Sequence, residues 1–131
     1  MIKIYVSHSI RGKYGKDATA KEMNLNCQRA IKFGNGLRET FPEYNFYIPA
    51  EHDLFVQKAY FKNYLTEEQI LDIDCDIITE CEAMLIYAPD GHISRGMGVE
   101  MRFTSIWHIP TFLVNKDSVT IDFLGKFFRG L

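Results

Sequence analysis

Residues 83–114 read AMLIYAPDGHISRGMGVEMRFTSIWHIPTFLV, and this stretch decides the fold. Residues 83–87 are an unbroken apolar run of strand length, which Pro89-Asp90-Gly91 ends with a turn. A helix is expected from about residue 97 to residue 108, and a proline then opens a further strand over residues 111–114. Strand, helix and strand in this order are typical of an α/β domain with a parallel sheet.

The same alternation extends toward the N-terminus. Residues 2–6 form a β-rich run, and residues 45–48 form a second one that ends at a proline. Between these two runs, apolar residues recur at helical spacing over residues 20–41. Gly34 and Gly36 are expected to weaken this helix toward its end.

A further helix begins near Thr66, because a capping hydroxyl followed by the acids Glu67 and Glu68 is typical of a helix N-terminus. A short apolar helix is expected to close the chain. No repeat, linker or low-complexity tract divides the sequence. We therefore predict that residues 1–131 form a single α/β domain, a Rossmann-like or flavodoxin-like three-layer sandwich with a mainly parallel sheet.

The composition is that of an ordinary globular protein, with 47% hydrophobic and 24% charged residues. The formal net charge of -2 predicts no broad basic surface, so a nucleic-acid polymer is not an expected partner, whereas a small anion needs only a local positive site. The three cysteines are widely spaced and form no CxxC pair, which argues against disulfides and zinc. No stretch resembles a signal peptide or is long enough to span a membrane, so a reducing, cytoplasmic location is expected.

Parallel α/β sheets bind ligands at the carboxyl ends of their strands, which directs attention to three loops. The first loop, Ser7-His8-Ser9-Ile10-Arg11-Gly12, is followed by Lys13 and Lys16. Hydroxyls, a glycine and cations suit a phosphate, because the backbone can approach it closely and a guanidinium can bind two of its oxygens. Taken alone, however, the string favours a solvated loop with routine charges.

The other two loops also carry unusual polar residues. Residues 94–100, SRGMGVE, place small residues at the start of a helix, where free amides and the helix dipole bind anions. A glycine-rich turn that starts a helix explains the same string, and Glu100 then is an ordinary first-turn acid. In the middle loop, Glu51 and His52 could face a ligand, although a solvated loop or a helix cap is favoured there.

Asp74 is the most informative single residue on physical grounds. At about 100° per residue, a helix over residues 68–81 places Asp74 in the middle of an apolar arc, opposite Asp72 and Asp76. A lone carboxylate on such an arc is costly unless it is paired or used, so a functional role is favoured over a buried acid that caps a backbone group. The arc consists of Ile70, Leu71, Ile73, Ile77, Ile78 and Cys81.

Together these segments resemble the nucleoside 2-deoxyribosyltransferase superfamily, and most closely its 2'-deoxynucleoside 5'-monophosphate N-hydrolase branch. Residues 5–12, YVSHSIRG, match the tyrosine and the phosphate loop of that branch, except that His8 replaces the usual glycine. Glu51-His52 fits the glutamate–histidine pair after the second strand, and Asp74 falls at the family's aspartate. Residues 94–100 fit the serine-x-glycine-x-glycine-x-glutamate motif, and the segment before them is slightly longer than usual.

The resemblance covers nearly the whole chain and implies cleavage of the N-glycosidic bond of a (deoxy)nucleoside 5'-monophosphate. It implies that Glu100 is the nucleophile, that Tyr5 orients it, and that Asp74 assists the departing base. No metal or organic cofactor is needed for this chemistry. The phosphate-binding residues that the resemblance implies are Ser9, Ile10, Arg11, Gly12, Ser94, Gly96 and Gly98, and the base-binding residues are Glu51 and His52.

Three functions compete at this point. A hydrolase would release the free base and (deoxy)ribose 5-phosphate, a transferase would pass the sugar to a second base, and a binding module or sensor would do no chemistry. The SIRG loop with its added lysines favours the hydrolase, and the intact set Tyr5, Asp74 and Glu100 argues against the binding module. The family also implies a homodimer or larger homo-oligomer, in which a residue of a neighbouring subunit completes the phosphate site, and Lys116 and Ser118 are the candidates for it.

Overall fold

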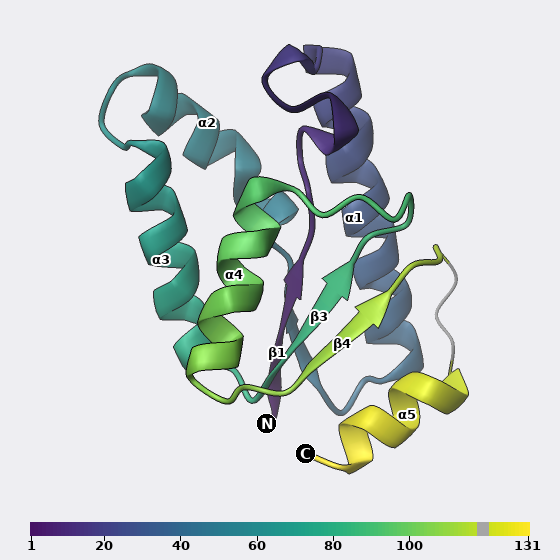
Figure 1. The fold of residues 1–131 in the computed structure, drawn as a ribbon. Coiled ribbons are helices and arrows are strands. Elements are labelled where there is room, and N and C mark those ends of the chain that lie inside the picture. Colours follow the sequence, from purple (N-terminus) through teal and green to yellow (C-terminus); the bar gives the residue numbers. More distant parts are fainter. Residues whose placement is uncertain (118–120) are drawn as a thin grey trace.

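The computed structural model describes residues 1–117 and 121–131. The strands in this part of the chain form one sheet in the order β2-β1-β3-β4, and all three neighbouring pairs are parallel (Figure 1). The predicted parallel sheet is therefore confirmed. Its strands are β1 (Lys3–Ser7), β2 (Asn45–Tyr47), β3 (Ala83–Tyr87) and β4 (Thr111–Val114).

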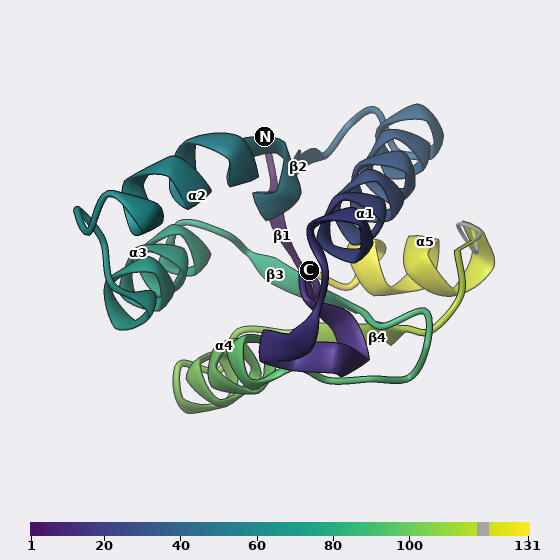
Figure 2. The same ribbon diagram turned by 90° about the horizontal axis from the view of Figure 1, so that it is seen from above.

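Helices cover both faces of the sheet, which confirms the three-layer α/β sandwich. Figure 2 shows α1 and α5 on one side of the strands and α3 and α4 on the other, with α2 beside α3. The chain passes from β1 to β2 on one side and then crosses back to β3, so the strand order reverses at β1 and β3, where such sheets bind ligands. The helices are α1 (Ala20–Thr40), α2 (Asp53–Phe61), α3 (Glu67–Thr79), α4 (Arg95–Ile106) and α5 (Ile121–Arg129).

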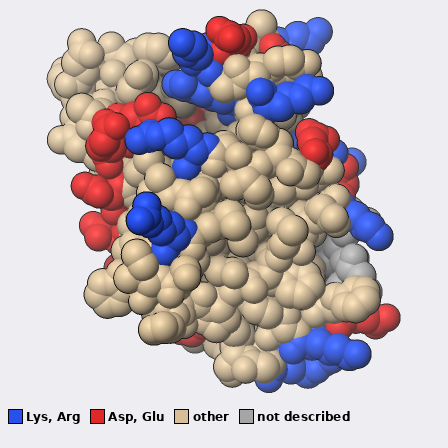
Figure 3. Space-filling view, in the orientation of Figure 1, with Lys and Arg blue, Asp and Glu red and all other residues tan. Residues whose placement is uncertain are grey.

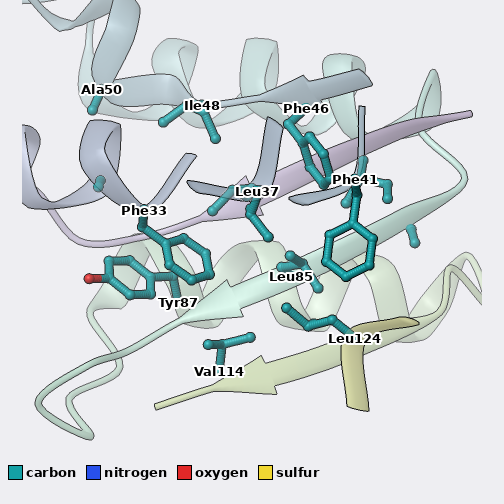
Figure 4. Close-up of a cluster of buried hydrophobic side chains, with 14 of the residues drawn as sticks. Phe33, Leu37, Phe41, Phe46, Ile48, Ala50, Leu85, Tyr87, Val114 and Leu124 are labelled. Atoms are coloured by element: carbon teal, nitrogen blue, oxygen red, sulfur yellow. The ribbon is translucent and has the colours of Figure 1, made fainter. Parts of the chain in front are cut away.

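Alternate side chains of β1 point to opposite faces of the sheet, and the two faces differ in polarity. Ile4 and Val6 enter the hydrophobic core shared with α1 and α5, part of which is drawn in Figure 4. Tyr5 belongs to the opposite cluster, between the sheet and α3 and α4. Successive side chains of a strand point to opposite faces, so Ser7 follows Tyr5 toward α4. The second face thus carries the polar side chains of β1.

The helix α1 runs to Thr40, although the two glycines near its end were expected to weaken it. Thr19 and Glu22 begin it with a reciprocal capping box. At Gly34 an added Cβ would lie 2.7 Å from Cγ1 of Ile48, which is fully buried just after β2. The glycine therefore lets α1 pack closely against this segment, and the packing outweighs the low helix propensity of glycine.

The ends of several elements differ from the prediction by one or two residues. The helix α4 begins at Arg95 because Ser94 accepts a hydrogen bond from the Met97 amide at 3.2 Å and caps it. It ends at Ile106, shortly before His108, whose φ is 55°. The strand β4 has the predicted bounds, whereas β2 ends one residue early. No helix within residues 1–117 and 121–131 is long and apolar enough to cross a bilayer.

Three helical segments were not predicted. They are α2 and two short 3-10 helices, η1 (Gly12–Asp17) and η2 (Pro49–His52). None of the side chains of α2 is buried, so this helix lacks the apolar stripe that marks a core helix in a sequence. The sequence pattern therefore gave no signal for it.

The helix α3 begins as predicted, with Thr66 and Gln69 forming a capping box. Ile78, on the side of α3 that faces the sheet, is fully buried, whereas Asp72 and Asp76 are exposed. Ile73, which was expected on the apolar arc, is 47% exposed. It lies at the edge of the arc, where the helix turns away from the sheet toward solvent.

Candidate functional site

A cavity of about 450 Å³ opens at the carboxyl end of β1, at the upper end of the sheet in Figure 1. Its walls come from β1 and the loop after it, the start of η2, the inner side of α2, the first turns of α3 and the N-terminal part of α4. Tyr5, Asp74 and Glu100 all line it. The structure thus brings together the three residues expected to perform the chemistry.

Glu100 is held at the base of this cavity by two hydroxyl groups. The Tyr5 hydroxyl donates to Oε2 at 2.5 Å, and the Ser7 hydroxyl donates to Oε1 at 2.7 Å. The side chain is 5% exposed, so both carboxylate oxygens are fixed in a largely dry environment. Ser7 was not singled out from the sequence as a site residue, although its spacing of two from Tyr5 on a strand places it on the same face.

Burial changes the acid–base properties of the two carboxyl groups. It raises the pKa of Glu100 from 4.5 to about 7, against the lowering effect of the hydrogen bonds from Tyr5 and Ser7. Burial also raises the pKa of Asp74 from 3.8 to about 6, and the pKa of Tyr5 lies well above its ordinary value for the same reason. The charge of Asp74 adds a smaller rise to the pKa of Glu100, so between about pH 6 and 7 the two carboxyl groups together hold one proton and one negative charge.

The cavity is open to an anion on the side of the first loop. Ser9, Ile10 and Arg11 line it, and so does Lys16, which the sequence analysis noted only as a cation. Arg11 and Lys16 form no ion pair within the described residues. Figure 3 shows Lys and Arg gathered near the upper end, where η1 lies, while acidic residues follow α3 along the left edge. A protein with a net charge of -2 therefore has a cationic region on the first-loop side of this cavity, while Asp53, Glu67, Asp74 and Glu100 line its other walls.

Gly12 supports the loop from behind the cavity. Its φ is 67°, its amide donates to Ser9 Oγ at 2.8 Å, and a Cβ there would lie 2.9 Å from Nδ2 of Asn26. Asn26 donates from Nδ2 to the carbonyl oxygen of Ile10 at 2.9 Å and so fixes the loop to α1. Asn26 was not expected from the sequence, because nothing in its local pattern shows that it meets a loop 16 residues away.

At the start of α4, Ser94, Arg95 and Gly96 line the cavity and Gly98 does not. Arg95 also lies 3.7 Å from Glu67, so part of its charge is compensated across the cavity mouth. The helix presents its N-terminal end to the same space as Arg11, and free amides at such an end favour an anion. Gly98 therefore belongs to the helix start without facing the ligand space.

His8 links the first loop to the segment after β2. Its Nε2 accepts a hydrogen bond from the Ala50 amide at 3.1 Å, which places the proton of the neutral ring on Nδ1. Burial lowers the pKa of His8 from 6.5 to about 4, so the ring is neutral at physiological pH. Nδ1 is buried and has no hydrogen-bond partner within the described residues.

The expected base-binding pair does not face the cavity. Glu51 forms a bidentate pair with Arg38, at 2.7 and 2.8 Å, and His52 stacks on the Tyr47 ring with 5.2 Å between centroids. Both are exposed and lie outside the cavity wall. The residues that do line it at this level come from the next helix and are Asp53, Val56, Gln57 and Tyr60. The pair is displaced because η2 turns these two side chains toward α1 and β2.

The two residues that were candidates for completing the phosphate site of a neighbouring subunit follow β4 in the sequence. Lys116 is exposed, and Ser118 lies outside the described residues. Among the residues that the structure describes, no three His, Cys, Asp or Glu side chains are grouped so as to hold a metal ion.

The site can therefore bind an anion at one end, hold a carboxylate at its base and present a second carboxyl group beside it. These features come from segments that are far apart in the sequence, and they meet at the switch point of the sheet. Comparison of the chain with protein-family models, with curated proteins and with solved structures finds no match in any of the three.

Proposed function

We propose that this protein is an N-glycosidase that hydrolyses a (deoxy)nucleoside 5'-monophosphate to the free base and (deoxy)ribose 5-phosphate. The observation that carries the proposal is the position of Glu100, a buried carboxylate with both oxygens fixed by Tyr5 and Ser7 at the base of a cavity. The family resemblance of the motifs supports the same reaction. Arg11 and Lys16 supply the local positive charge that a 5'-phosphate requires.

The reaction has two steps. In the first, a Glu100 oxygen forms a bond to the anomeric carbon of the sugar while the bond from that carbon to the base nitrogen breaks. The base leaves with the electron pair of the broken bond, and Asp74 donates a proton to it. Positive charge builds on the sugar during this step, and the negative charge of Glu100 stabilises it.

In the second step, water attacks the anomeric carbon and releases Glu100. Asp74, now ionised, accepts the proton of the water and returns to its starting state. The phosphate is not altered, and its role is to hold the sugar so that the anomeric carbon lies above Glu100. The net reaction consumes one water and forms one free base and one sugar phosphate.

The deciding experiment is incubation with a panel of nucleosides and nucleoside monophosphates, read out as free-base release. We expect release from a monophosphate, and we expect Glu100→Gln to fold normally and to lose at least about 100-fold in turnover. The control is Glu43→Gln, an exposed acid between α1 and β2, which should retain full activity.

Three other results would change the assignment. Near-normal turnover by Glu100→Gln would remove this residue from the mechanism. A wild type that prefers nucleosides, and that needs a second base for turnover, would be a deoxyribosyltransferase. A wild type that binds nucleotides without releasing any base would be a binding module.

A further inference from the structure

The helix α2 contacts the cavity instead of the hydrophobic core. None of its side chains is buried, yet the helix has a distinct inner side. That side faces the cavity at positions i, i+3, i+4 and i+7, while Leu54, Phe55 and Phe61 on the outer side are more than 70% exposed. The inner positions are Asp53, Val56, Gln57 and Tyr60. A helix whose inner stripe meets no core is suited to contact a ligand.

The helix α3 supplies a matching stripe on the opposite wall. Its positions i, i+3, i+4 and i+7 are Glu67, Ile70, Leu71 and Asp74, and all four line the same cavity. Figure 2 shows α2 and α3 side by side at the end of the sheet that carries β2. Ile70 and Leu71 in the middle of the α3 stripe are apolar, and Val56 is the apolar residue beside Gln57 in the α2 stripe, so the two helices form a mainly apolar slot. Asp74 closes the slot at the end nearest Tyr5 and Glu100.

Gln57 is the amide side chain in the α2 wall, and a hydrogen bond fixes its orientation. Its Nε2 donates to Oδ1 of Asp53 at 3.1 Å, and the other oxygen of Asp53 accepts from the Cys27 thiol at 3.7 Å. A carboxylate only accepts hydrogen bonds, so the NH₂ group of Gln57 must face Asp53 and its carbonyl oxygen must face away. That oxygen has no hydrogen-bond partner within the described residues.

We propose that the base of the substrate binds in the slot between α2 and α3, and that Gln57 is a specificity-determining residue whose carbonyl oxygen accepts a hydrogen bond from an N–H group of the base. Apolar walls with a few fixed polar groups are the usual construction of a site that recognises a flat, polar-edged ring. The slot also ends at Asp74, the proton donor to the departing base. This inference rests on the proposed function, because it requires that the cavity holds a nucleotide.

The test measures binding separately from turnover. Glu100→Gln protein is titrated by calorimetry with dAMP, dCMP, dGMP and dTMP, and with deoxyribose 5-phosphate, which has no base. Adding Gln57→Leu should weaken the best nucleotide about five- to tenfold, the usual worth of one neutral hydrogen bond, and should reduce the preference among the four bases. Binding of deoxyribose 5-phosphate should not change. The matched control is Lys58→Met on the exposed side of the same helix, which should alter none of these affinities.

The outcomes separate this inference from the proposed reaction. If the wild type releases base while Gln57→Leu keeps the base preference, the role of Gln57 is overturned and the reaction stands. If nucleotides bind with a preference that Gln57→Leu removes, but no base is released, the role of Gln57 stands and the reaction fails. Equal weakening of nucleotide and deoxyribose 5-phosphate also overturns base recognition. Gln57→Met, with an unbranched side chain of similar length, repeats the test if the leucine variant unfolds.

Discussion

Glu100 and Asp74 are both carboxylic acids in one cavity, but their partners suit them to different tasks. Tyr5 has a single hydroxyl proton and donates it to Glu100, which also accepts from Ser7. Protonating Glu100 would take an acceptor position away from these two donors, whereas protonating Asp74 leaves both hydrogen bonds in place. In the free protein the pKa of Glu100, about 7, still lies above that of Asp74, about 6, so the proposed reaction requires that the bound substrate shifts the shared proton to Asp74 and leaves the negative charge on Glu100.

Arg11 is the side chain that we expect to distinguish a monophosphate from a nucleoside. Its guanidinium lines the cavity without an ion-pair partner in the described residues, so a phosphate can bind it without competition. We expect Arg11→Ala to raise the KM for a monophosphate roughly tenfold or more, since a charge-assisted contact is worth roughly 1.5–3 kcal/mol. The KM for a nucleoside should remain nearly unchanged.

The control for this measurement is Arg102→Ala, an exposed arginine farther along α4. It removes the same charge from the protein without touching the cavity, so both KM values should stay at the wild-type level. Equal effects of Arg11→Ala on nucleoside and monophosphate would show that this residue does not bind the phosphate.

At the scale of elements, α3 carries two aspartates in opposite environments. Asp74 lines the cavity, whereas Asp72 is exposed on the other side of the same helix. We expect Asp74→Asn to reduce turnover strongly while leaving the melting temperature near or above the wild-type value, because the substitution removes a partly buried charge. Asp72→Asn should change neither property. Substrates with better leaving bases should lose least in Asp74→Asn, since they need less help to depart.

The result that contradicts this assignment is also specific. If Asp74 had only a structural role, Asp74→Asn would lower the melting temperature, and its turnover per folded molecule would match that of the wild type. Matching activities of the Asp74 and Asp72 variants would equally remove Asp74 from the reaction.

The elements that the sequence predicted correctly are those with local signals. The bounds of β4 follow from a proline and an apolar run, and the start of α3 follows from the hydroxyl cap at Thr66, whereas α4 begins two residues before the predicted start because Ser94 caps it. The helix α2 gave no such signal, because its inner stripe mixes polar and apolar residues that face a cavity. Periodicity detects a core-facing surface and does not detect a ligand-facing one.

The residues of the candidate site also divide into those that the sequence indicated and those that it did not. Tyr5, Asp74 and Glu100 were found from motifs and helix geometry, and the structure brings them to one cavity. Ser7 was missed as a partner of Glu100 because the hydrogen bond joins residues 93 positions apart. Gln57 was missed because its role depends on the cavity that α2 forms with α3, and this cavity is a tertiary feature.

At the scale of the whole molecule, two buried groups make stability depend on pH in opposite directions. The pKa of Glu100 is raised from 4.5 to about 7 in the folded protein, so the unfolded chain releases a proton that the folded chain keeps, and the free energy of unfolding falls as pH rises through this window. The pKa of His8 is lowered from 6.5 to about 4, so the free energy of unfolding falls as pH drops from 6.5 to 4. The two effects oppose each other between about pH 4.5 and 6.5.

Because the two contributions oppose each other, the pH dependence of the unfolding free energy of the wild type does not resolve them, and a variant is needed to separate them. The difference in unfolding free energy between Glu100→Gln and the wild type should grow in favour of the variant as pH rises from 4.5 to 7, by up to about 3 kcal/mol at about 1.4 kcal/mol per pKa unit. Asp74, with its pKa raised to about 6, adds a slope of the same sign as Glu100 in both proteins. Urea unfolding at a series of pH values measures the difference, and Glu43→Gln should show none. A difference that stays constant with pH would mean that the pKa of Glu100 is not raised in the folded protein, and the dry environment described for its carboxyl group would then be wrong.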